Sequence, residues 1–279
     1  MQDPHSDKLR LSPAYDRFER LVLDMPSRGV LRIRLGGPGR LNTVDAKMHA
    51  ELAEIWRVVD ADENVSAVLL RGDGKGFSAG GDFTSVQSGI EDFNARARMW
   101  KETRDIVYNI LHCSKPIVSA MHGVAVGAGL VCGLLSDISV GAHDARLIDG
   151  HTRLGVVAGD HAAMVWPLLC GMAKAKYYLL LCDPISGQEA ERIGLISLSV
   201  PEEELQDTAM KIAERLAAGA PNAIRLTKHA LNGWFRMASP IFDASCAMEF
   251  LTITSPDVVE GLESHREKRK PAFDAHSPL

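Results

Sequence analysis

The chain has 279 residues, and its hydrophobic fraction of 46% is enough to fill a sizeable core in one or two domains. A formal charge of −5 argues against the broad basic face that binds a nucleic-acid backbone, so we expect no nucleic-acid partner. The five cysteines are widely spaced and form no CxxC motif, which indicates neither a disulfide framework nor a thiolate metal site. A reducing compartment, the cytoplasm, fits this composition best.

The first twenty residues mix acids, bases and proline without an apolar segment, and they predict an exposed N-terminal arm rather than a secretory signal. Residues 117–136 carry no Lys, Arg, Asp or Glu and therefore imitate a membrane helix. Because glycines make a poor uninterrupted helix, we interpret this stretch as a buried strand, a glycine-rich turn and a buried helix. We expect no membrane partner.

Hydrophobic periodicity predicts that strands alternate with helices over the first two hundred residues. In chain order the predicted elements are strands at Leu21–Leu23 and Val30–Leu35, a helix over Asp45–Asp60, a strand at Val65–Arg71, a helix from roughly Ile90 to His112, a strand at Ile117–Met121, a helix from about Ala128, strands at Asp137–Gly141 and Ala145–Ile148, and a loop His151–Asp160 that leads into a helix.

The last quarter of the sequence contains only helical patterns, at Asp207–Ala218, Asn222–Arg236, Phe242–Ile253 and Asp257–Lys268. The complete order predicts an α/β core of strand–strand–helix turns over residues 21–204, between the N-terminal arm (1–20) and a helical C-terminal region (205–279).

Two glycine-rich loops are the first candidates for chemistry. Gly74–Ala79 matches the G-x-G-x-x-A dinucleotide fingerprint, but Gly80 and Gly81 follow it and would break the helix that a nicotinamide site requires. The second loop, Gly123–Leu130, lies between a buried strand and a buried helix, so its amides lie at the positive end of the helix dipole. Either the two loops converge as a main-chain oxyanion hole, or both are tight turns required by close packing.

Four segments carry a resemblance to a known family: Gly72–Phe83 (GDGKGFSAGGDF), Lys115–Asp137 (KPIVSAMHGVAVGAGLVCGLLSD), Pro221–Asn232 (PNAIRLTKHALN) and Glu260–Phe273 (EGLESHREKRKPAF). In the order and spacing of these segments the chain resembles the crotonase, or enoyl-CoA hydratase/isomerase, superfamily over nearly its whole length. The resemblance implies a crotonase-like spiral of ββα turns, C-terminal helices that build a homotrimer or a dimer of trimers, and an acyl-coenzyme A thioester as the ligand.

The resemblance also implies functional residues. The donors to the thioester oxygen would be the main-chain amides of Gly81 and Ala128. Ala79 and Asp82 of the first segment, and Lys268 of the basic run after the last helix, are candidates for contacts to coenzyme A, although that run can equally be a solvated helix end. Coenzyme A would enter as part of the substrate, so no permanently bound cofactor is expected.

The sequence departs from the hydratase pattern at both catalytic glutamates. Val131 stands two residues after the GxG where the first glutamate is expected, and a valine cannot transfer a proton. The second glutamate is also missing, and His151 lies close to its expected position. Straightforward hydration, which needs an acid and base pair, is therefore not expected.

His151 and Asp160 form the candidate catalytic pair, because their nine-residue separation resembles that in the β-diketone (retro-Claisen) hydrolase branch of the superfamily. A carboxylate that orients a histidine ring makes a sensible base. Alternatively, Asp160 only caps the helix that follows it, and His151 is a hydrogen-bonded loop residue. Glu249 lies on an apolar-patterned helix, and we expect it to be solvent-exposed, the alternative being that it faces a neighbouring subunit and contributes to the pocket. The histidines show no regular metal-ligand spacing, so no metal is predicted.

Three functions follow from these observations. The first is an enoyl-CoA hydratase/isomerase family enzyme that acts on an acyl-CoA thioester. The second is a hydrolase that cleaves a carbon–carbon bond in β-diketones or β-keto thioesters through His151 and Asp160. The third is an acyl-CoA-binding protein without catalytic activity. The sequence leaves the acyl chain and the reaction open.

Overall fold

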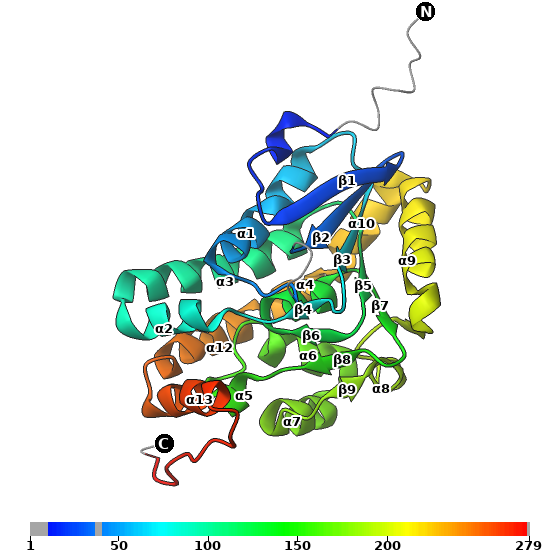
Figure 1. Ribbon diagram of the computed structural model, residues 1–279. Coiled ribbons are helices and arrows are strands. Elements are labelled where there is room, and N and C mark those ends of the chain that lie inside the picture. The colour runs from blue at the N-terminus through cyan, green and yellow to red at the C-terminus, as the bar shows by residue number, and fades with distance from the viewer. Residues whose placement is uncertain (1–10, 37–40, 278–279) are drawn as a thin grey trace, which may run out of the picture.

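The computed structural model describes residues 11–36 and 41–277 (Figure 1). Its strands are β1 Leu21–Ser27, β2 Val30–Leu35, β3 Ala67–Gly72, β4 Ser78–Ala79, β5 Ile117–Met121, β6 Val124–Val126, β7 Ile138–Ala142, β8 Arg146–Ile148, β9 Ile185–Ser186 and β10 Leu198–Val200. One sheet has the order β1-β2-β3-β5-β7-β10 and the other has the order β4-β6-β8-β9. The predicted mixed α/β fold is therefore confirmed.

The helices fall into a core group and a C-terminal group. The core group is α1 Ala46–Ala61, α2 Phe83–Glu91, α3 Phe93–His112, α4 Gly127–Leu135, α5 His151–Leu154, α6 Ala162–Cys170, α7 Met172–Leu181 and α8 Gly187–Arg192. The C-terminal group is α9 Glu202–Ala217, α10 Pro221–Leu231, α11 Gly233–Met237, α12 Ser239–Thr252 and α13 Pro256–Arg266.

The first sheet is parallel except at its edge. β1 pairs antiparallel with β2, whereas β2, β3, β5, β7 and β10 pair parallel in that order. All five residues of β5 are buried, which explains its continuous apolar run. In Figure 1 the second sheet lies below the first, with β4 and β6 next to α4 at the centre of the molecule. This arrangement places the two glycine loops next to each other, with Gly81 exposed and Ala128 half-buried.

Several predicted elements differ from the structure. The helix expected from roughly Ile90 to His112 is α3, which begins at Phe93 because the carboxylate of Asp92 accepts the N–H of Asn94 at 2.8 Å, and the helix α2 before it was not predicted. The helix expected over Asn222–Arg236 is two helices, α10 and α11. The glycine turn before α4 contains the short strand β6, and the loop His151–Asp160 begins with α5. Short elements of three or four residues leave little periodicity to detect.

The N-terminal arm is described from residue 11 onward, and most of this half is exposed as expected, but it is anchored at two positions. Tyr15 and Phe18 are buried in the core. The carboxylate of Glu51 on α1 accepts the main-chain N–H groups of three consecutive residues, Glu19, Arg20 and Leu21. Charge-assisted bonds to backbone N–H groups therefore fix this segment to the core. Residues 1–10 lie outside the described residues.

No helix in the described part of the chain is long and apolar enough to cross a membrane. The apolar stretch at residues 117–136 forms β5, β6 and α4 instead.

A buried ion pair joins the C-terminal helices to the core sheet. Lys228 on α10 lies 2.7 Å from the carboxylate of Asp137 and donates to the carbonyl oxygen of Lys115 at 2.8 Å. The same carboxylate accepts the N–H of Ile117 at the start of β5. Burial raises the pKa of Asp137 in spite of its partner. The charged form of the Asp137 carboxylate therefore depends on Lys228.

Replacing Lys228 with methionine should destabilise the protein by about 3–5 kcal/mol, because it leaves a buried carboxylate without its cation. Urea unfolding at neutral pH measures this change. The matched control is Lys211→Met, at an exposed lysine on α9, which should change stability little. A Lys228→Met protein as stable as the control would show that the ion pair does not hold α10 in place.

Candidate functional site

The two glycine loops lie directly against each other. β4 pairs parallel with β6, so that Ser78 is opposite Ala125 and Ala79 is opposite Val126. Gly127 has a φ of +56°, and a Cβ built there would lie 3.0 Å from the Cα of Gly80 and 3.3 Å from the nitrogen of Gly81. Close packing therefore requires glycine at this position, and it also brings the ends of the two loops together.

The amides of Gly81 and Ala128 have no acceptor among the described residues. Val44 bonds to the carbonyl of Gly80 and accepts from Asp82, which leaves the N–H of Gly81 directed away from this bridge. Ala128 is the second residue of α4, where N–H groups have no partner within the helix and the dipole is positive. Two donors in adjoining loops are thus available to an external oxygen atom.

The three candidates for coenzyme A contacts are engaged differently. Ala79 donates its N–H to the carbonyl of Leu41 at 2.8 Å. Asp82 caps α2 by accepting from the N–H of Thr84. Lys268 is exposed just beyond α13, a helix that approaches the first loop where the rings of His265 and Phe83 lie 4.4 Å apart. Their contact with coenzyme A stays a prediction.

Three carboxylates from three separate segments surround His151, the first residue of α5. Asp149 Oδ1 lies 2.9 Å from Nδ1 of the ring. On the other side of the ring, Nε2 faces Asp160 Oδ2 at 3.6 Å and Glu249 Oε1 at 3.9 Å. The side chain of His151 is 16% exposed, whereas Asp149 and Asp160 are nearly enclosed. The ring is thus accessible and its acidic neighbours are shielded.

The charges of this cluster depend on one another. Burial lowers the pKa of His151, but Asp149, Asp160 and Glu249 together outweigh burial and raise it well above 6.5. Burial raises the pKa of Glu249 to about 8, with His151 opposing and the two aspartates adding to the rise. Burial would also raise the pKa of Asp160, but His151 and His161 bring it below its ordinary value. The raised pKa of His151 favours its imidazolium form at neutral pH, so only part of the ring population is neutral and able to accept a proton.

The cluster and the glycine loops meet along α4. Cys132 follows Ala128 by four residues and so shares its face of the helix, about 6 Å further along. Burial raises the pKa of the Cys132 thiol, and the nearby carboxylate of Asp160 raises it further. α4 also packs against β8 and α6, the elements that precede Asp149 and follow Asp160. The convergence of Gly81 and Ala128 with His151 and Asp160 on one substrate stays a prediction.

Comparison with known proteins identifies the family. Residues 26–276 match the family described as enoyl-CoA hydratase/isomerase. The chain belongs to this family. It is 30% identical over 255 residues to the 1,2-epoxyphenylacetyl-CoA isomerase of Escherichia coli K12, an alignment that covers 90% of this chain and 97% of the relative. It is also 29% identical to the probable enoyl-CoA hydratase EchA12 of Mycobacterium tuberculosis H37Rv, with 97% and 98% of the two chains covered.

Solved structures agree with this assignment. An enoyl-CoA hydratase/isomerase from Mycobacterium paratuberculosis matches with a TM-score of 0.83 and 30% identity, over 88% of this chain and 98% of that chain. A β-diketone hydrolase from Anabaena sp. PCC 7120 matches with a TM-score of 0.80 and 24% identity, over 88% and 98%; this likeness concerns the fold alone. The resemblance to the crotonase superfamily is therefore confirmed.

Two expectations about this site are wrong, and a third is met in part. Asp160 does not cap α6, because His161 occupies the N-cap position and Asp160 bonds to its ring. Asp160 does face His151, at Nε2, but the carboxylate that accepts the hydrogen bond from Nδ1 is that of Asp149. Glu249 is 9% exposed and faces His151, rather than lying in solvent.

Sequence reasoning missed Asp149 and underrated Glu249. Asp149 lies two residues before His151, and its only signal was a short acidic side chain next to a candidate base. Glu249 had a clearer signal, since it lies within the apolar pattern of α12 between the buried Cys246 and Ile253. A carboxylate on the buried face of a helix indicates a partner in the interior.

The residues around His151 also include the donor atoms of a candidate metal site. Asp149, His151 and Asp160 offer donor atoms within 4.8 Å of one another. However, the two aspartates face different nitrogens of the same ring, so the contacts are those of an imidazole between two carboxylates. The expectation that no metal is bound stays a prediction.

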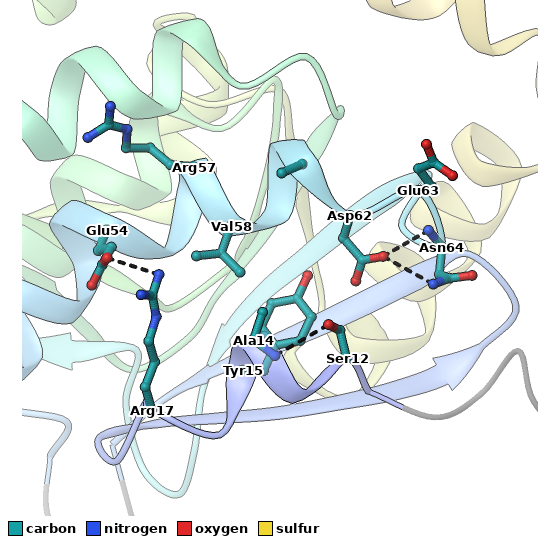
Figure 2. Close-up of a pocket in the computed structure, with 11 residues that line it drawn as sticks. Ser12, Ala14, Tyr15, Arg17, Glu54, Arg57, Val58, Asp62, Glu63 and Asn64 are labelled. Atoms are coloured by element: carbon teal, nitrogen blue, oxygen red, sulfur yellow. Dashed lines mark hydrogen bonds and ion pairs between the residues drawn. The ribbon is translucent and has the colours of Figure 1, made fainter.

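A separate hollow of about 600 Å³ lies between the 3₁₀-helix Pro13–Tyr15 and the second half of α1 (Figure 2). Figure 2 shows the ring of Tyr15 below Val58, with Arg17 paired to Glu54 at 2.9 Å. None of the residues that line this hollow belongs to the cluster around His151 or to the two glycine loops.

Proposed function

We propose that the chain is an acyl-CoA-transforming enzyme in which the amides of Gly81 and Ala128 bind the thioester oxygen and His151 transfers a proton. One observation carries this proposal: two amides without an acceptor lie in adjoining glycine loops, and α4, which begins at the second loop, packs against β8 and α6 on either side of the histidine that acids surround. Val131 at the position of the first hydratase glutamate is buried and apolar, which argues for chemistry on one base rather than hydration by two glutamates.

The geometry suits formation and collapse of an enolate. Nδ1 of His151 donates to Asp149, so Nε2 is the nitrogen that can accept a proton. His151 would take the proton from the α-carbon, and the electron pair of that C–H bond would move onto the thioester oxygen held by the two amides. Protonated Glu249 can then supply a proton at another carbon, which completes an isomerisation. Transfer of the abstracted proton from Nε2 of His151 to the Glu249 carboxylate, which faces it at 3.9 Å, then restores both groups.

The coenzyme A part of the substrate would lie near Ala79, Asp82 and Lys268. A hollow of about 640 Å³ beside α5 supports a role for the basic tail, because Arg153, Lys270 and Phe273 line it. Cations suit phosphates, and an aromatic ring suits a nucleobase. Coenzyme A arrives with the substrate in this proposal, so the enzyme needs no resident cofactor. The five free cysteines accord with a cytoplasmic location.

A second candidate function is hydrolysis of a carbon–carbon bond. The separations of 3.6 and 3.9 Å between Nε2 of His151 and the two facing carboxylates suit a bridging water. His151 would remove a proton from this water, the hydroxide would attack a ketone carbon, and the C–C bond would break to leave an enolate that Glu249 protonates. This route needs a 1,3-dicarbonyl substrate.

Deuterium exchange separates these functions. The full chain is incubated with butanoyl-CoA in D₂O, and incorporation at the α-carbon is followed by mass spectrometry. We expect exchange at the α-carbon, together with hydration of crotonyl-CoA at least ~10²-fold slower than by an ordinary hydratase, since one acid or base contributes about that much. Binding of butanoyl-CoA without exchange would indicate a non-catalytic protein. Cleavage of cyclohexane-1,3-dione without coenzyme A would favour the hydrolase.

The C-terminal helices present an apolar surface that suits self-association. Exposed apolar side chains gather on α10 to α12, namely Leu226, Leu231, Trp234, Met237, Ile241, Met248 and Leu251. Because contiguous apolar surface of this kind marks interfaces, we propose a homotrimer or a dimer of trimers. Sedimentation should give three or six times the chain mass, and Trp234→Lys should lower it. A monomer at micromolar concentration would contradict the proposal.

A further inference from the structure

A chain of three buried side chains lies behind Asp160. Trp166 on α6 donates its indole Nε1–H to Nε2 of His161 at 3.4 Å. Nδ1 of His161 lies 2.7 Å from Oδ1 of Asp160. Trp166 is 0% exposed, His161 1% and Asp160 7%. The catalytic proposal above uses Asp160 but gives no role to the other two residues.

The direction of these hydrogen bonds fixes the tautomer of His161. An indole N–H can only donate, so Nε2 of His161 has to accept and carries no proton. The ring proton of a neutral imidazole is then on Nδ1, which donates to Asp160. Trp166 therefore selects the form of His161 that can serve as a donor to the carboxylate.

This donor determines what Asp160 presents to His151. Because Oδ1 is bonded to His161, the plane of the carboxylate is held and Oδ2 is the oxygen that faces Nε2 of His151. A neutral donor stabilises the ionised carboxylate without placing a second cation beside His151. The thiols of Cys132 on α4 and Cys246 on α12 also lie near Asp160, and burial raises the pKa of both. They therefore stay neutral, and the carboxylate keeps its charge.

We propose that His161, with its tautomer fixed by Trp166, is a positioning residue that keeps Asp160 ionised and directed at Nε2 of His151. The inference rests on the proposed function in one respect: the alignment of Asp160 serves catalysis only if His151 transfers the proton. The alignment itself is measurable without turnover. Three acidic groups face His151, namely Asp149, Asp160 and Glu249, and only Asp160 depends on His161.

The first test determines the tautomer directly. Long-range ¹H–¹⁵N correlation spectra of the full chain, labelled with ¹⁵N-histidine, distinguish the two neutral tautomers and the imidazolium. Between pH 6 and 8 we expect His161 to be the neutral Nδ1–H form, and in Trp166→Phe to be a mixture of tautomers. An imidazolium or an Nε2–H tautomer in the unaltered protein would overturn the proposal, and so would an unchanged His161 in Trp166→Phe.

The second test follows the titration of His151 in variants of His161. His161→Leu removes the donor, so Asp160 can rotate or bind a proton, and the titration midpoint of His151 should fall by about 1 pH unit. His161→Asn keeps an N–H donor near the position of Nδ1 and should restore most of the difference. The matched control is His143→Leu, at a histidine bonded to Ser199, which should leave the midpoint unchanged. Equal midpoints in all three variants would overturn the proposal.

The outcomes for the proposal and for the enzyme function are separable. If His161 has the expected tautomer and His161→Leu shifts His151, but α-proton exchange does not depend on His151, the proposed function fails and the alignment stands. If exchange depends on His151 but not on His161, the function stands and the positioning role is wrong. In the enzyme, a positioning role predicts a lower kcat for His161→Leu with little change in KM. If His161→Leu fails to fold, the tautomer of His161 in the unaltered protein and in Trp166→Phe decides whether the positioning role is correct.

Discussion

Replacing His151 with glutamine should lower the rate of α-proton exchange by ~10²–10⁴-fold, the usual contribution of a positioned base. Glutamine preserves much of the size of the ring, but its amide cannot accept a proton near neutral pH. Asp149, Asp160 and Glu249 would remain around the vacated position, so binding of the acyl-CoA should change less than turnover. Exchange rates at saturating butanoyl-CoA, with KM measured in parallel, give this comparison.

The pH profile provides a second measurement of the same role. A base has to be neutral to act, and the surrounding carboxylates hold the pKa of His151 well above 6.5. The fraction of neutral His151, and with it the exchange rate, should therefore still rise as the pH increases beyond 6.5. This rising limb should be absent from the residual activity of His151→Gln. Because His151 and Glu249 are coupled, the limb reports the pair rather than one residue.

A histidine outside the cluster is the control for this substitution. His143→Gln removes a partly buried ring that bonds to Ser199, and it should leave exchange nearly unchanged. Thermal unfolding of both variants verifies that each is folded. Full exchange activity in a folded His151→Gln protein would exclude His151 as the base and leave the glycine loops without a proton-transfer partner.

The fold was predictable where the sequence signals were long and local. The strand Ile117–Met121 has the expected bounds, and α1 begins at Ala46 behind the capping side chain of Asp45. The break between α2 and α3 was not predictable in the same way, because it contains no glycine or proline next to Asp92 and depends on a single capping contact. Strand β6 has three residues, which is too short for an alternating pattern.

The candidate site was only partly predictable, because its residues come from distant parts of the sequence. Gly81 and Ala128 were found through glycine spacing, which reflects the close approach of two loops. The environment of His151 was not found, since Asp160 and Glu249 reach it only through the packing of α6 and α12 against each other. Helix-capping signals also misled the interpretation of Asp160. An aspartate just before an apolar helix usually caps that helix, but here the carboxylate of Asp160 bonds to the side chain of His161.

The oxyanion hole can be tested by removing one amide hydrogen. Ala128→Pro deletes the N–H at the second position of α4, where proline is tolerated because no intrahelical hydrogen bond is lost. Loss of one such donor costs ~10²–10³-fold in rate. We therefore expect α-proton exchange to fall by this factor, because the charge that develops on the thioester oxygen would be held by Gly81 alone. Exchange of butanoyl-CoA in D₂O is again the assay.

Ala128→Ser is the matched control, since it keeps the amide and adds only one oxygen atom at the same position. It should retain most of the activity. Circular dichroism and thermal unfolding show whether Ala128→Pro is folded. Substitutions in the glycine loops and at His151 should change the pH profile in different ways. Ala128→Pro retains the base, so its exchange rate should be lower at every pH but should still rise with pH. A folded proline variant with full activity would mean that Ala128 does not donate to the reacting oxygen. The packing of Gly127 against Gly80 would then be sufficient to explain the second loop.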